Sequence, residues 1–155
     1  MVDVSEKAPT LRSAVAEGWV RLNGEAMAAL LSGNIPKGDV ICAAQLAGIQ
    51  AAKRTPELLP LCHPLGEISA IEVVLHPQEE DGTVHIEARV KAEGRTGVEM
   101  EALCAVAAAA LCVHDMCKGL DPAVEIAGIR LLEKSGGRQG LWRNPETAEA
   151  KKPDA

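Results

Sequence analysis

The sequence ends a long apolar stretch with three side chains that can carry charge or protons. Residues 108–120 read AAALCVHDMCKGL, which gathers His114, Asp115 and Lys118 just before Gly119. The negative end of a helix dipole and burial both disfavour a charged Asp115, whereas a lysine three residues on favours it. An acid and a base under such opposing influences can transfer protons. On spacing alone, a surface ion pair is the more common explanation, and His114 reads as a helix cap.

A second candidate lies in LPLCHPL, residues 59–65, where two prolines predict an ordered, non-helical loop. Cys62 and His63 are the residue types of a nucleophile and its base. Adjacent side chains of an extended segment point in opposite directions, so this pair is not expected to act together. The loop therefore either presents His63 to a ligand or is purely structural. Cys112 and Cys117 lack the spacing of a zinc site and read as core thiols.

A third candidate, Glu101, shares one side of a predicted helix with Asp115. Fourteen residues separate them, which is about 21 Å along a helix axis. One small molecule cannot easily contact both from one straight helix. Either the two acids bind different ends of a long ligand, or Glu101 of one subunit meets Asp115 of another. Glu99 is expected to form a capping box with Thr96.

Basic residues are scattered among these segments: Lys37, Lys53, Arg54, Lys134 and Arg138. The last two flank or lie within the glycine-rich segment SGGRQG (135–140), whose backbone can hold phosphate oxygens. The order Lys-Ser-Gly-Gly is not that of a Walker A loop. Taken singly, each basic residue is most simply a solvated surface charge.

The strands and helices that position these residues are predicted from the spacing of apolar residues and from helix-capping residues. Alternating patterns predict strands over 17–23, 67–77, 83–92 and 123–134, and helical patterns cover 24–33, 40–54 and 96–119 with a turn at 55–58. Asn23, Asp39 and Thr55 are the expected N-caps, and Gly119 the expected stop. The order is that of an α+β, ferredoxin-like βαββαβ fold with an additional helix, its helices on one face of an antiparallel sheet. The other face, with Val73, Leu75 and Ile86, is expected to need a second subunit.

Composition narrows the class of protein. The 155 residues suit one domain, and a net charge of −6 with no Phe or Tyr and two Trp argues against a nucleic-acid partner. A core of small aliphatic residues requires close helix–sheet packing. Five cysteines without framework spacing indicate reduced thiols. The first ten residues lack signal-peptide features and no apolar stretch suits a membrane span, so a soluble, cytoplasmic protein is expected.

Several segments together resemble the molybdenum cofactor biosynthesis protein C family. They are KGDV (37–40), AGIQAAKRTPELLPLCHPL (47–65), GRTGVEMEAL (94–103), HDMCK (114–118) and RLLEKSGG (130–137). The resemblance implies a single synthase domain over residues 1–140, leaving 141–155 as a flexible C-terminal tail. It also implies a ferredoxin-like fold and a homohexamer, a trimer of dimers with sites at the dimer interface.

Family members are cyclic pyranopterin monophosphate synthases, which are lyases. They convert 3′,8-cyclo-7,8-dihydroguanosine 5′-triphosphate to cyclic pyranopterin monophosphate and release diphosphate. The resemblance implies that Asp115 and Lys118 are catalytic. It assigns substrate binding to Leu61, Cys62, His63, Met100, Glu101, Lys37, Lys53 and Lys134. No cofactor is implied, although Mg²⁺ on the triphosphate is compatible with it.

Two other functions remain compatible with the residues themselves. A small βαββαβ domain can be a non-enzymatic metabolite sensor, because a fold does not fix a function. A Cys/His metal protein is the third class. Release of diphosphate from the cyclised substrate would distinguish a synthase from a metabolite sensor. Metal analysis of protein purified without chelator would distinguish a synthase from a metal protein.

Overall fold

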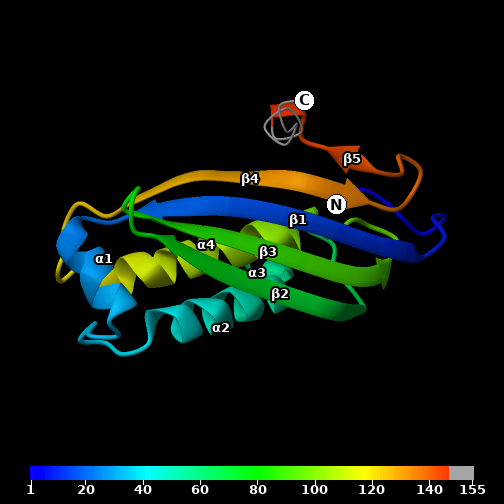
Figure 1. The fold of residues 1–155 in the computed structure, drawn as a ribbon. Coiled ribbons are helices and arrows are strands. Elements are labelled where there is room, and N and C mark those ends of the chain that lie inside the picture. Colours follow the sequence, from blue (N-terminus) through cyan, green and yellow to red (C-terminus); the bar gives the residue numbers. More distant parts are fainter. Residues whose placement is uncertain (147–155) are drawn as a thin grey trace, which may run out of the picture.

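A computed structural model of the chain describes residues 1–146. Its centre is one antiparallel sheet of five strands in the order β2-β3-β1-β4-β5 (Figure 1). The strands are β1 (Thr10–Arg21), β2 (Glu67–Gln78), β3 (Thr83–Gly94), β4 (Glu125–Ser135) and β5 (Trp142–Arg143). The expected α+β, ferredoxin-like architecture is confirmed.

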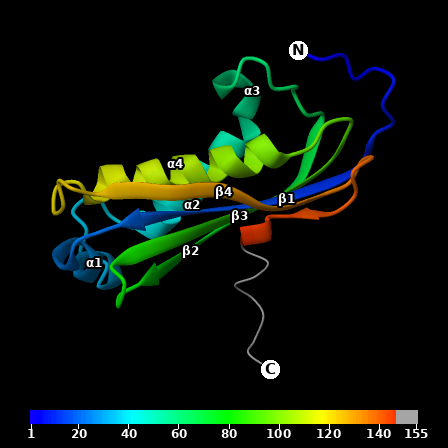
Figure 2. The ribbon, with the colours of Figure 1, turned by 90° about the horizontal axis from the view of Figure 1, so that it is seen from above.

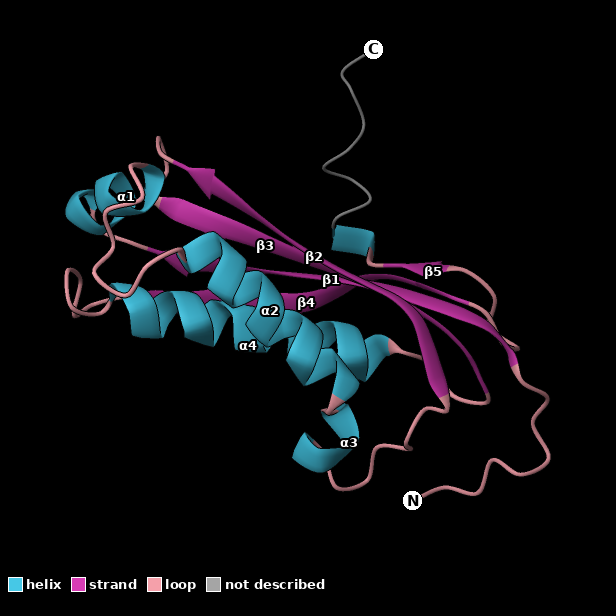
Figure 3. Cartoon of the chain, turned by 90° about the horizontal axis from the view of Figure 1, so that it is seen from below, coloured by secondary structure: helices cyan, strands magenta, loops and turns pink. Residues whose placement is uncertain are grey.

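Within residues 1–146, the structure defines the helices α1 (Gly24–Leu31), α2 (Val40–Lys53), α3 (Thr55–Leu58) and α4 (Glu99–Cys117). The two long helices, α2 and α4, lie together across one face of the sheet, as Figure 3 shows. Of the two short helices, α1 lies at one end of the sheet, whereas α3 lies outside the layer of α2 and α4, on the side of the N-terminal segment (Figure 2). The helices α1 to α4 therefore lie to one side of the strands or at their ends.

The predicted caps have mixed outcomes. The side chains of Asn23 and Asp39 accept hydrogen bonds from Ala26 N and Cys42 N, as expected. Thr55 is instead the first residue of α3, and its buried hydroxyl donates to the carbonyl oxygens of Ala51 and Ala52. The Thr96–Glu99 box is wrong, because α4 starts after Val98 without a side-chain cap. The predicted stop is confirmed, since α4 ends at Cys117 with Lys118 as its C-cap and Gly119 next, although Gly119 does not adopt a positive φ.

β1 begins at Thr10, seven residues before the predicted strand 17–23. The added segment, TLRSAVA, is rich in alanine and polar residues, which carry little strand signal of their own. Its conformation is set by pairing, because all twelve residues of β1 lie opposite β3. At the other end of the chain, Trp142 and Arg143 pair with Lys134 and Glu133 as β5. The remainder of the predicted tail, 147–155, lies outside the described residues.

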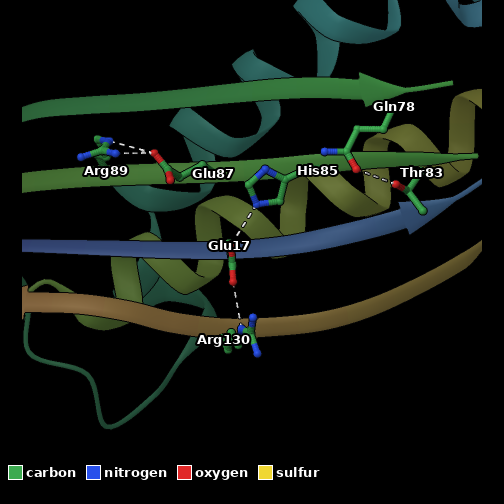
Figure 4. A network of polar contacts seen from close by, with 7 residues as sticks. All are labelled: Glu17, Gln78, Thr83, His85, Glu87, Arg89 and Arg130. Carbon is green, nitrogen blue, oxygen red and sulfur yellow. Dashed lines mark hydrogen bonds and ion pairs between the residues drawn. The ribbon is translucent and has the colours of Figure 1, made fainter. Parts of the chain in front are cut away.

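The open face of the sheet differs from the expectation. Val73, Leu75 and Ile86 are buried in this chain's own core, beneath the helices. The opposite face carries a polar network in which Glu17 accepts from His85 and Arg130, each at 2.9 Å (Figure 4). The Arg130 guanidinium lies 5.3 Å from the centre of the Trp19 ring. Glu17 is largely buried by these neighbours, so this face is partly covered without a second subunit.

Small side chains bring α4 close to α2 and to the strands. The fully buried residues of α4 include Ala102, Ala105, Ala109 and Ala110. At Gly48 in α2, an added Cβ would lie 2.8 Å from Ala105 O and 3.2 Å from the methyl groups of Val73. Although α4 is long and apolar enough to match a membrane span, its alanine stripe is packed into this core. The close packing predicted from composition is confirmed.

Gly48→Val should therefore destabilise the protein by about 1–3 kcal/mol, because the new atoms meet backbone and packed methyl groups that cannot move away. Urea unfolding at fixed protein concentration measures this change. Gly119→Ala is the control, since a Cβ there meets no heavy atom within 4 Å. Equal midpoints for the two variants would contradict the packing argument.

Candidate active site

The C-terminal end of α4 holds a carboxylate between two lysines. The Lys37 Nζ lies 2.6 Å from Asp115 Oδ2 and also donates to the Asp115 carbonyl oxygen at 2.9 Å. The Lys118 Nζ lies 2.7 Å from Asp115 Oδ1. Lys37 comes from the loop between α1 and α2, so the fold brings it to α4 from far away in sequence. All three side chains are about half exposed and open to a ligand.

The charge state of Asp115 follows from this geometry. Hydrogen bonds from Lys118 and Lys37 lower its pKa from 3.8 to about 2. The opposing effect of burial is small because the side chain is 54% exposed. The sequence predicted opposing effects on the pKa of this carboxyl, and the lowering effect of the two lysines is the larger one. Asp115 is thus an anion at neutral pH, already paired with both cations.

At the other end of α4, Glu101 is buried with an incomplete set of hydrogen bonds. Its Oε1 accepts from the Cys62 thiol at 3.9 Å. Its Oε2 is buried and has no hydrogen-bond partner among the described residues. Burial raises the pKa of Glu101, and burial beside this acid raises that of the Cys62 thiol. The arrangement offers an acceptor to an incoming N–H or O–H donor.

The loop 59–65 carries further predicted residues to this end. The His63 ring, as expected, does not pair with Cys62; its Nε2 lies 2.7 Å from Val2 O in the N-terminal segment. A hollow beside it is lined by Lys53, Pro64 and Glu101, so Lys53 also belongs here. Leu61 and Met100 are apolar side chains left exposed to solvent.

Lys134 lies near the same end of α4, where its Nζ is 3.0 Å from Glu99 Oε1. Glu99 is thus the partner of a β4 lysine. Both residues line a larger cleft between the N-terminal segment and the loop that follows β4. This cleft also contains Arg12 and Arg95. The sequence analysis assigned neither a role, although Arg95 lies within the segment GRTGVEMEAL.

The ten predicted residues therefore form two groups in one chain. Lys37, Asp115 and Lys118 lie at the C-terminal end of α4, and the other seven lie near its N-terminal end. Lys37, which the resemblance assigns to substrate binding, lies beside Asp115. In residues 1–146, no three His, Cys, Asp or Glu side chains are grouped as a metal site.

Comparison with known proteins places the chain in a family. Residues 1–137 match the MoaC family. The chain is 52% identical over 148 residues to a molybdenum cofactor biosynthesis bifunctional protein of Synechococcus elongatus, which covers 96% of this chain but 46% of that protein. It is 51% identical over 145 residues to a cyclic pyranopterin monophosphate synthase of Chloroflexus aurantiacus, covering 94% of this chain and 88% of the relative.

A cyclic pyranopterin monophosphate synthase of a Roseiflexus species is 53% identical over 144 residues, with coverage of 93% and 90%. These matches extend through both ends of α4, the loop 59–65 and β4. The chain belongs to the MoaC family.

Proposed function

We propose that this protein converts 3′,8-cyclo-7,8-dihydroguanosine 5′-triphosphate to cyclic pyranopterin monophosphate, with release of diphosphate, in molybdenum cofactor biosynthesis. The reaction is that of the synthases to which the chain is more than half identical over nearly its whole length. The observation that carries the proposal in this chain is the Lys37–Asp115–Lys118 cluster, whose three charges suit proton transfer beside a polyanion.

The conversion opens the five-membered purine ring, rebuilds it as a pyranopterin and joins a sugar hydroxyl to the α-phosphate. Asp115 and Lys118 transfer protons during ring opening and reclosure. The lysines also stabilise negative charge as diphosphate leaves. Phosphate oxygens compete with Asp115 for both lysines, so substrate binding weakens their ion pairs and makes the carboxylate a stronger base.

Glu101 binds the nucleobase of the substrate. Its unpaired Oε2 accepts from the N–H edge of the guanine-derived ring, which presents donors suited to a carboxylate. His63, Cys62 and Lys53 lie beside it and complete this part of the site.

Each complete site combines two subunits. The span of α4 between Glu101 and Asp115 is about 21 Å, too long for one small substrate. An isologous dimer places Glu101 of one subunit near Asp115 of the other, and three dimers form a homohexamer. Exposed apolar residues on the helical side, Leu46, Met100 and Leu111, are consistent with burial between subunits. The protein acts in the cytoplasm without a resident cofactor, and Mg²⁺ accompanies the triphosphate if it is used at all.

Asp115→Asn should lower turnover of the cyclised nucleotide by about 10²–10⁴-fold, because an amide cannot take the proton. Release of diphosphate measures this. Glu125→Gln is the matched control, since it changes an exposed acid whose partner is Arg21 and not a lysine of the cluster. A folded, oligomeric Asp115→Asn protein with near-normal turnover would rule out the assigned role.

Lys37→Met should raise the pKa of Asp115 in substrate-free protein from about 2 toward 3.8, because one cation that stabilises the ionised form is lost. In the unaltered protein, the depressed pKa stabilises the fold above about pH 3.8, and this contribution is lost as pH falls through about 2. Carboxyl resonances followed by NMR titration measure the shift, with Lys91→Met as the control. Titration of Asp115 near 3.8 in all three proteins would contradict the ion-pair geometry.

If two subunits share each site, combining two inactive variants in one oligomer should restore part of the enzymatic activity. Co-expressed Asp115→Asn and Glu101→Gln subunits should recover about one quarter of wild-type activity, because half of random dimers are mixed and each has one intact site. Differently tagged subunits, purified in tandem, identify the mixed oligomers. If mixed oligomers are as inactive as either parent, each site uses Glu101 and Asp115 of the same chain.

A further inference from the structure

The turn that follows α4 contains a buried carboxylate outside the charged cluster and outside the Glu101 end of the site. Asp121 is only 4% exposed. Its Oδ1 accepts from Ala123 N at 2.9 Å, and its Oδ2 accepts from Asn23 N at 2.7 Å, across 98 residues of sequence. A buried charge is stable only where hydrogen bonds compensate its loss of water, so this contact firmly links the turn to the start of α1.

The hydrogen bond between Asn23 and Asp121 completes the N-terminus of α1. Asn23 caps this helix, and its Oδ1 accepts from Ala26 N at 2.8 Å. In a capping box, a Glu or Gln at the third helical position, here Ala26, accepts from the backbone N–H of the cap residue. Asp121 takes that role from a distant part of the chain. The Asn23 Nδ2 also donates to Leu120 O at 3.1 Å, so α1 is bound twice to the turn after α4.

The chain that leads from α1 to Lys37 is short and fixed. Asn34 N donates to Ala29 O at 2.8 Å, which ties the loop to the last turns of the helix. Ile35 is buried in the core, and Gly38 N donates to Ile35 O at 2.9 Å, which closes a turn around Lys37. The backbone of Lys37 therefore follows the position of α1.

The chain that leads from Asp115 to Asp121 is equally constrained. Asp121 N donates to Cys117 O at 3.1 Å, so the backbone folds back directly where α4 ends. This end of α4 lies at the end of the sheet that carries α1 (Figure 1). The two segments thus meet at two contacts, Asn23 with Asp121 and Lys37 with Asp115.

The two contacts differ in their exposure to water. The Lys37 and Asp115 side chains are 49% and 54% exposed, and an exposed ion pair stabilises a geometry only weakly. The bond to Asp121 is buried, and a charge-assisted hydrogen bond is stronger where water does not compete. The buried contact therefore sets the separation at which the exposed ion pair forms.

We propose that Asp121 is a positioning residue, which holds α1 through the Asn23 N–H and thereby keeps Lys37 against Asp115. Both of its oxygens are bonded to main-chain N–H groups, so it acts on the cluster through the backbone. The consequence for turnover rests on the proposed function, whereas the effect on the ion pair does not.

Asp121→Asn separates the long-range link from the local turn. The amide keeps one oxygen for Ala123 N but sets an NH₂ group against the Asn23 N–H, which loses its acceptor. In NMR titrations of substrate-free protein, the pKa of Asp115 should rise from about 2 toward 3.8, because Lys37 is no longer held beside it. In a Lys37→Met background, Asp121→Asn should have no further effect on this titration, because both changes act on one contact.

Val90→Ala is the control for a loss of stability alone. Val90 is fully buried in β3 opposite Ala14, whereas Asn23 follows the other end of β1. Its truncation leaves a cavity in the core away from the contact with Asp121. This variant should lower the urea midpoint of unfolding, as Asp121→Asn does, but leave the pKa of Asp115 at about 2.

Turnover of the cyclised nucleotide should fall by about 10–100-fold in Asp121→Asn, because a displaced catalytic group reacts slowly, and should fall no further when this change is added to Lys37→Met. An unchanged Asp115 titration in Asp121→Asn, an equal shift in Val90→Ala, or additive losses in the double variant would overturn the proposal. A shifted titration in a protein whose wild type does not convert the nucleotide would reject the proposed function and support the positioning role.

Discussion

Close packing of α4 against the sheet and α2 is the constraint on which the rest of the structure depends. Alanines on one side of the helix and Gly48 of α2 let the backbones approach until added side-chain atoms would collide. Because such a core is intolerant of displacement, α4 is a fixed rod between strands and solvent. Its two ends, at Glu101 and Asp115, are therefore held apart at a set distance. The separation of the two groups of polar residues follows directly from this packing.

Charge is organised locally in a protein that is acidic overall. The cluster at one end of α4 contains two lysines and one carboxylate, and the cleft at the other end has three more basic than acidic residues. A polyanion is thus attracted at short range although the net charge of the chain is −6. Since both regions are solvent-facing, their long-range attraction weakens as salt increases, whereas direct contacts within the cleft depend less on salt.

Local patterns were sufficient for most of the fold. Alternation identified β2, β3 and β4, and the caps Asn23 and Asp39 fixed the starts of α1 and α2. The early part of β1 was missed because its alanines and serine adopt a strand only through pairing with β3. The face carrying Val73 was misassigned, because alternation defines two faces but not which one meets the helices. Lys37 and Arg12 reach their partners through tertiary contacts, which no local motif encodes.

The hydrogen bonding of the two ends of α4 differs in a way that suits catalysis. At Glu101, a buried oxygen without a partner costs the free chain roughly 1–3 kcal/mol, and a bound donor removes that cost. At Asp115, both oxygens are already paired, so a ligand must displace lysines that the carboxylate holds. Binding of a hydrogen-bond donor is therefore favoured at Glu101, whereas the Asp115 end must rearrange when an anionic ligand takes its lysines. In the proposed reaction, interaction energy gained at Glu101 is used to free the Asp115 carboxylate as a base, which raises the rate instead of only the affinity.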